Sequence, residues 1–185
     1  RRTAASNPDI VAVRTPDDSL SLTWSQLLAR VDALAGGLAK LGVGHGDTVA
    51  IMLGNRPEFH IVDLASVTLG ATPFSIYTTY PANEIEYLVE DAGCRVAIVE
   101  ERYLPVMLEA RQSLPGLEHV IVVDGEPPQG TIALHDVEQS NPDFDASAAA
   151  AAIAPDDVLT LIYTSGTTGP PKGVQLSHRN AMSAA

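Results

Sequence analysis

Short apolar runs alternate with amphipathic stretches along the first two thirds of the chain. The apolar runs have the length of buried strands and span Thr48 to Leu53, Ala71 to Ile76, Val96 to Val99 and His119 to Val123. The stretches between the runs repeat apolar residues at helical spacing, and we expect helices between Thr23 and Gly42, from Pro57 to about Gly70, from Pro81, and from Glu101 to Ser113. This alternation predicts an α/β fold, a doubly wound, largely parallel sheet with flanking helices.

Two local signals mark the start of this pattern. Residues Val11 to Thr23 read as a hairpin turned at Thr15 to Asp18, because Pro and Asp favour a turn between two apolar runs. Gln26 follows Thr23 by three residues, which is the spacing of a capping box. We therefore expect a hairpin that leads directly into the first long helix.

The pattern weakens between residues 124 and 157. Gly125 to Gly130 reads as a loop, and the Ala-rich stretch Ala146 to Ala154 indicates a short helix without an amphipathic stripe. A buried strand is expected to restart at Val158 to Tyr163. We therefore divide the chain into an α/β part (1–123), a connector (124–157) and a final part that holds a strand, a loop and the start of a helix (158–185).

Composition excludes several classes of function. The chain has 185 residues and a net charge of −12, which argues against nucleic-acid binding because duplex recognition uses clustered Lys and Arg. The charge-free stretch Leu64 to Asn83 is broken by Gly70, Pro73 and Pro81, so we expect no integral membrane segment. The single cysteine, Cys94, cannot form an internal disulfide, is expected to be buried, and fits a cytoplasmic protein.

The segment YTSGTTGPPKG, from Tyr163 to Gly173, carries the most specific chemistry. Hydroxyls, glycines and one lysine are its candidate binding groups: Thr164, Ser165, Gly166, Thr167, Thr168, Gly169 and Lys172. Glycines let successive N–H groups face one concave side, which binds anions, and one hydroxyl could ligate Mg²⁺. The lysine supplies a point charge for phosphate. The segment therefore predicts a cradle for a polyphosphate.

Two other interpretations of this segment are weighed against the cradle. It is not a Walker A loop, because two prolines separate Gly169 from Lys172 and an apolar run follows instead of a helix. Ser, Thr, Gly and Pro also build ordinary connecting loops. The ordered string is more specific than its composition, so the cradle is the interpretation that we favour.

The string YTSGTTGPPKGV resembles the signature loop of the adenylate-forming superfamily, which includes acyl-CoA synthetases, luciferases and peptide-synthetase adenylation domains. Weaker likeness covers nearly the whole chain, at Leu22 to Leu27, Gly46 to Ala50, Leu69 to Pro73 and Ser177 to Asn180. Ser75 to Thr79, followed by an acidic helix, is most similar to the long-chain acyl branch. The resemblance implies that residues 1–185 are a partial AMP-binding domain, the incomplete N-terminal part of an acyl-CoA synthetase-like large domain.

The resemblance implies a two-step reaction. A fatty acid attacks the α-phosphate of ATP, with Mg²⁺ as the usual ion, and coenzyme A then displaces AMP to form a thioester. On this chain, the seven loop residues from Thr164 to Lys172 would hold the β- and γ-phosphates. The family's adenine, ribose, hinge and adenylation-lysine elements are expected beyond Ala185, so we assign no catalytic residue here and expect the 185-residue chain alone to be inactive.

Alternatives to an enzyme part remain. One is a non-catalytic, truncated module that binds a nucleotide or a partner protein, and another is an unrelated phosphotransfer enzyme with its own phosphate loop. Because the sheet is cut just after the loop, exposed strand edges and apolar surface are expected to cause self-association. The acidic residues Glu84, Glu86, Glu90 and Asp91 are expected to form a solvated helix face.

Overall fold

The structure is a computed structural model that describes residues 1–164 and 169–183. Within these residues, seven strands form one sheet in the order β7-β6-β5-β3-β4-β8-β9. The strands are β3 (Thr48–Met52), β4 (Thr72–Ser75), β5 (Val96–Val99), β6 (His119–Val122), β7 (Ile132–Ala133), β8 (Val158–Thr164) and β9 (Lys172–Ser177). All neighbours are parallel except β8 and β9. The four strands predicted in the first part of the chain form the centre of this sheet.

Helices connect the strands in the predicted alternation. They are α1 (Arg2–Ser6), α2 (Trp24–Lys40), α3 (Pro57–Thr68), α4 (Ala82–Asp91), α5 (Leu104–Arg111), α6 (Leu134–Gln139), α7 (Ala146–Ala151) and α8 (His178–Ser183), with a 3-10 turn (Glu101–Tyr103) leading into α5. In the described parts of the chain, none of these helices combines the length and apolar character that a bilayer crossing requires.

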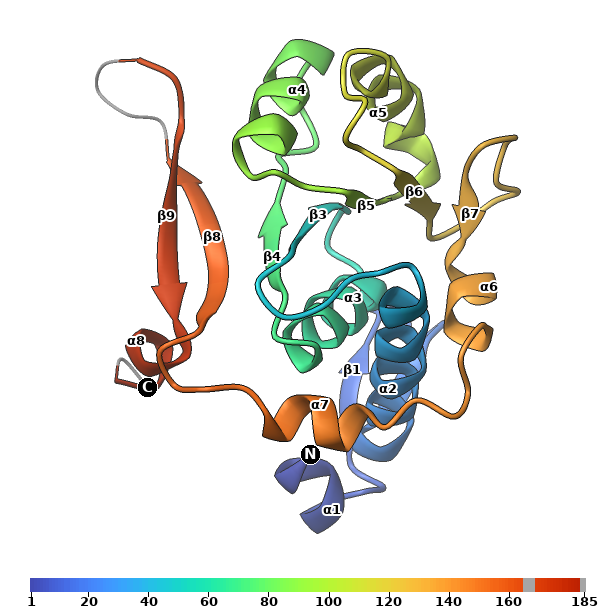
Figure 1. The fold of residues 1–185 in the computed structure, drawn as a ribbon. Coiled ribbons are helices and arrows are strands. Elements are labelled where there is room, and N and C mark those ends of the chain that lie inside the picture. The colour runs from blue at the N-terminus through green and yellow to red at the C-terminus, as the bar shows by residue number, and fades with distance from the viewer. Residues whose placement is uncertain (165–168, 184–185) are drawn as a thin grey trace.

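The helices cover both faces of the sheet and create two cores (Figure 1). Helices α2 and α3 pack on one face, around fully buried side chains such as Leu34 and Ile51. Helices α4 and α5 pack on the opposite face, around Phe74 and Met107. Strands enclosed by helices on both sides read as continuous apolar runs, which is why the runs predicted the sheet. The doubly wound α/β fold is confirmed.

The N-terminal signals also form as predicted. Strands β1 (Val11–Arg14) and β2 (Ser21–Thr23) form a separate antiparallel hairpin. The Thr23 hydroxyl accepts the Gln26 amide at 3.3 Å, and the Gln26 side chain accepts the Thr23 amide at 2.9 Å, which completes the capping box. Gly42 follows the end of α2 with a φ of 86°, the left-handed conformation that glycine tolerates best.

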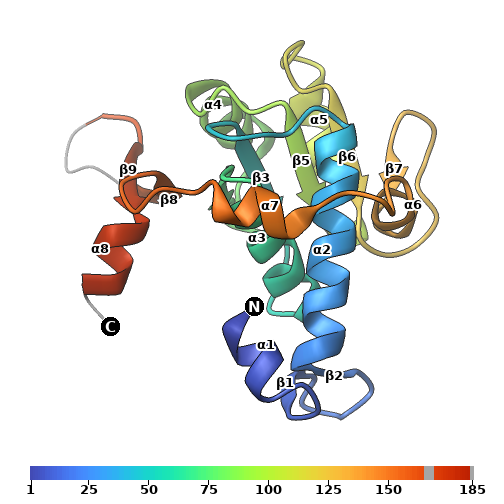
Figure 2. The same ribbon diagram turned by 60° about the horizontal axis from the view of Figure 1, so that its bottom comes forward.

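The expected connector holds more structure than its sequence indicates. Strand β7 pairs in parallel with β6, and α6 packs on α2 through the buried side chains of Leu134 and Val137. Helix α7, in the Ala-rich stretch, lies beside α2 and α3 (Figure 2). Residues 124–157 therefore extend the sheet and the core, in addition to linking the two outer parts of the chain.

Candidate functional site

Strands β8 and β9 form an antiparallel hairpin at one edge of the sheet, and the predicted phosphate loop joins them (Figure 1). Thr164 and Lys172, the first and last predicted site residues, are registered partners across the hairpin, and both are exposed. Gly169 has a φ of 94°, so the backbone uses the freedom that this glycine provides. The other predicted site residues, Ser165, Gly166, Thr167 and Thr168, lie outside the described residues. The hairpin thus places Thr164 and Lys172, the residues at the two ends of the loop, side by side.

The hairpin joins the parallel sheet through a short ladder. Strands β4 and β8 share the registered pair Phe74 and Leu161. A side chain adds to this pairing, because the Thr160 hydroxyl donates to the Pro73 carbonyl at 2.8 Å. The position of the loop therefore depends on side-chain contacts as well as on backbone pairing.

Tyr163 anchors the end of strand β8 that precedes the loop. Its ring meets Phe74 edge-on, with centroids 5.6 Å apart, and its hydroxyl donates to the Asp91 carboxylate at 2.8 Å. Burial and the Asp91 carboxylate both hold the pKa of Tyr163 above its ordinary value, so it stays a neutral donor. The ring also lies against Gly173, its registered partner, where an added Cβ would approach the ring to 3.3 Å.

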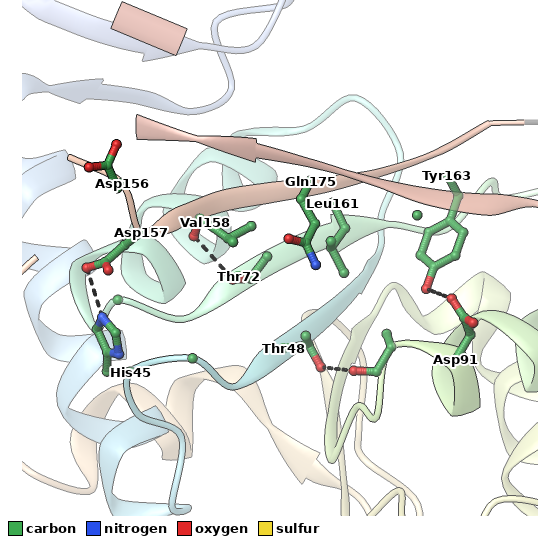
Figure 3. Close-up of a pocket in the computed structure, with 14 residues that line it drawn as sticks. His45, Thr48, Thr72, Asp91, Asp156, Asp157, Val158, Leu161, Tyr163 and Gln175 are labelled. Atoms are coloured by element: carbon green, nitrogen blue, oxygen red, sulfur yellow. Dashed lines mark hydrogen bonds and ion pairs between the residues drawn. The ribbon is translucent and has the colours of Figure 1, made fainter. Parts of the chain in front are cut away.

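A groove of about 420 Å³ runs along the sheet beneath β8 and β9. Figure 3 shows Tyr163 and Asp91 at one end of this groove and His45 and Asp157 at the other. Leu161 lines the groove between the two ends. Any group in the groove would therefore contact the strand that leads into the loop.

Polar side-chain contacts hold the start of β8 at the far end of the groove. His45 Nε2 lies 2.8 Å from Asp157 Oδ2, and Arg179 makes a two-point contact with Asp156. The hydrogen bonds from His45 and from the Ala154 amide hold the pKa of Asp157 below its ordinary value. These contacts join the start of β8 both to the loop before β3 and to α8.

Two residues near the loop were not identified from the sequence. The Tyr87 hydroxyl donates to the Pro171 carbonyl at 2.9 Å. Asp91, expected only on a solvated acidic face, is exposed but also accepts from Tyr163. Both residues lie on α4, about 80 residues before the loop in the sequence. Helical spacing marks Tyr87 only as part of the helix that covers the sheet, and no local pattern links it to the loop.

Comparisons with known proteins agree with this geometry. The family model of AMP-binding enzymes matches residues 1–185. The chain is 44% identical over 128 residues to an uncharacterized protein of Mycobacterium tuberculosis, a match that covers 69% of this chain and 71% of that protein. It is 33% identical over 177 residues to the long-chain-fatty-acid–CoA ligase FadD15 of Mycobacterium bovis, covering 94% of this chain but 30% of the ligase.

A solved structure shares the same fold. The anthranilate CoA ligase AuaEII, crystallised with anthranoyl-AMP, superposes with a TM-score of 0.89 and 31% identity, covering 96% of this chain and 33% of that enzyme. The chain therefore belongs to the AMP-binding enzyme family, whose matched members include adenylate-forming CoA ligases. It spans about a third of the length of the ligases that it matches.

Proposed function

We propose that this chain is the N-terminal, phosphate-binding part of an ATP-dependent fatty acid–CoA ligase. The observation that carries the proposal is the antiparallel pairing of Thr164 with Lys172 at the two ends of the hydroxyl-and-glycine loop. A cation and a hydroxyl at the mouth of one loop suit the β- and γ-phosphates of ATP. Ser165, Gly166, Thr167, Thr168 and Gly169 would complete the cradle in this proposal.

The proposed role of these residues is to hold the leaving group. Their hydrogen-bond donors and the Lys172 ammonium would position pyrophosphate and offset its charge while the acid attacks the α-phosphate. Mg²⁺ supplies further charge neutralisation when it is bound, and coenzyme A supplies the thiol that accepts the acyl group. The chain's own contribution is binding and orientation, so we propose no catalytic residue within it and expect it to be inactive alone.

The proposed substrate class is a long-chain fatty acid. The 33% identity to FadD15 over 94% of the chain supports this class, while the solved relative acts on an aromatic acid. A cytoplasmic location and the use of ATP, Mg²⁺ and coenzyme A belong to the same proposal. Exchange of labelled pyrophosphate into ATP tests it, in the longest protein that the reading frame encodes, with long-chain, aromatic and acetate substrates compared.

The chain offers a matched control for the exchange assay. It contains two lysines, Lys172 at the loop and Lys40 at the end of α2, where Lys40 donates to the Ser140 carbonyl. We expect Lys172→Ala to raise the KM for ATP by at least tenfold and Lys40→Ala to leave it unchanged. Equal effects of the two substitutions, or exchange that depends on the aromatic acid alone, would contradict the proposal.

A second candidate function is a non-catalytic module that binds a nucleotide or a partner. One observation favours it: the matched M. tuberculosis protein is itself short, since the 128 aligned residues make up 71% of it. The exposed cross-strand pair Ile162 and Val174 next to the sheet edge at β9 would then support self-association. Sedimentation velocity across a wide concentration range tests the self-association, and a monomer at every concentration contradicts it.

A further inference from the structure

Backbone pairing with β4 does not hold the loop end of the β8–β9 hairpin. Thr72 and Ile76 donate their amide hydrogens toward β3. Backbone polar groups alternate between the two sides of a strand, so those of Pro73, the residue after Thr72, face β8. The strands run parallel with Phe74 opposite Leu161, so Pro73, which has no N–H, weakens the ladder only at the start of β8. Strand β4 ends at Ser75, so Tyr163 and Thr164 extend past its last residue. The Thr160 hydroxyl bonds to the Pro73 carbonyl instead, but Thr160 lies in the first half of β8. The loop end of the hairpin needs another support.

Helix α4 supplies this support on both sides of the loop. The Tyr163 hydroxyl donates to Asp91 at 2.8 Å, and the Tyr87 hydroxyl donates to the Pro171 carbonyl at 2.9 Å. Tyr87 and Asp91 are four residues apart, so they lie on the same face of α4. Pro171 immediately precedes Lys172, so the second contact acts on the peptide group that leads into the lysine.

We propose that Tyr87 is a positioning residue for polyphosphate binding, because it orients the Pro171–Lys172 peptide and thereby directs the lysine toward the phosphates. This inference rests on the function proposed above for Lys172. A lysine side chain is long and flexible, so its reach is set by the backbone from which it starts. Proline already fixes φ at Pro171, and the Tyr87 bond restrains the carbonyl that remains free to rotate.

The contact can be measured without any nucleotide. Pro171–Lys172 is the only Pro-Lys pair in the sequence, so labelling proline carbonyls with ¹³C and lysine amides with ¹⁵N gives one carbonyl-to-amide NMR signal. In Tyr87→Phe, which keeps the ring and loses the hydroxyl, we expect the Pro171 carbonyl resonance to move upfield. Tyr77→Phe is the control, because Tyr77 is 64% exposed. A Pro171 resonance that is the same in both variants and the unsubstituted chain would overturn the inference.

Titration with inorganic pyrophosphate in the presence of Mg²⁺ then tests the consequence. Following the same Lys172 signal, we expect Tyr87→Phe to weaken pyrophosphate binding by about three- to tenfold, as the loss of one hydrogen bond would. An unchanged affinity despite a shifted Pro171 resonance would overturn the positioning role. If the Lys172 signal of the unsubstituted chain does not change when pyrophosphate is added, the proposed function is contradicted. The Pro171 shift would still decide whether Tyr87 orients this peptide.

Discussion

Gly37 of α2 lies directly against the backbone of Val137 in α6. A Cβ added to Gly37 would lie 2.6 Å from Val137 Cγ1 and would also overlap the Val137 carbonyl group. Only a glycine lets the two helix backbones approach this closely. The contact locks α6, and with it the edge strand β7, onto the core.

Gly37→Ala should therefore destabilise the chain, although alanine is the better helix former. The helix-propensity gain is at most about 1 kcal/mol, whereas overpacking against a backbone costs about 1–3 kcal/mol or more. We expect a net loss of about 1–2 kcal/mol in the free energy of unfolding, measured by urea denaturation. Gly116→Ala is the control, since a Cβ there meets nothing within 4 Å. Equal stability of the two variants would contradict this expectation and would show that α6 moves to accommodate the added methyl group.

Arg56 joins three carboxylates at the carboxyl ends of the central strands. It contacts Glu58 and Asp124 at 2.8 Å and lies 3.8 Å from the buried Glu100. Arg56→Met should lower the free energy of unfolding at pH 7 by about 2 kcal/mol, because it removes the guanidinium that contacts the partly buried Glu58 and Asp124, whereas Glu100 keeps Arg102. Arg179→Met, which breaks an exposed pair, should change it by less than about 0.5 kcal/mol. Urea denaturation measures both, and equal losses would contradict the expectation.

The cost of Arg56→Met should also depend on pH. Burial raises the pKa of Asp124, but the Glu101 amide and the Arg56 guanidinium outweigh burial, so the net pKa lies below its ordinary value. The stabilisation is therefore complete above the unfolded pKa of about 3.9 and is lost as the pH falls through the folded pKa. Repeating the denaturation at pH 3 should give a smaller difference between Arg56→Met and the unsubstituted chain. An unchanged difference would contradict this linkage.

The Asp63 carboxylate in α3 should have the opposite effect and destabilise the folded chain at pH 7. Burial raises the pKa of its carboxyl, and His60 opposes this only partly, so the ionised form is disfavoured in the folded chain. Asp63→Asn should therefore raise the melting temperature at pH 7, and the gain should vanish as the pH falls through the folded pKa toward about 4. Calorimetry at several pH values measures this, with the exposed Asp143→Asn as control. A melting temperature lowered at pH 7 would contradict it.

Cys94 should be inert until the chain unfolds. The side chain is 3% exposed, its thiol lies 3.1 Å from the Val96 carbonyl, and burial raises its pKa to about 11. Thiolate is the reactive form, so labelling with Ellman's reagent at pH 7 should be slow in buffer and fast in concentrated urea. Because Cys94 is the only cysteine, the signal has one source. Rapid labelling of the native chain would contradict the burial seen here.

Much of the fold could be predicted because its signals are local. The runs at Val96 to Val99 and His119 to Val123 became β5 and β6 almost without change of bounds, since strands covered on both faces must be apolar throughout. The capping box at Thr23 and Gln26 formed because its partners are three residues apart. The loop motif likewise indicated the family, which the family model matches over residues 1–185.

The elements that were missed depend on distant contacts. Strand β7 has two residues, too few for a periodic pattern, and it exists because β6 offers an edge and α6 docks on Gly37. Tyr87 and Pro171 are 84 positions apart, and only the packing of α4 on the sheet brings them together.

The sequence by itself determined the alternation of strands and helices in residues 1–123, the burial of the central sheet on both faces and the residue types available in the loop. These follow from side-chain patterns within a few residues of one another. Only the tertiary structure decided which residues hold the ends of the loop. Strand β4 ends at Ser75, before the loop end of β8, so the support there comes from a helix that precedes the loop by about 80 residues. Long-range contacts of this kind leave no periodic pattern in the sequence.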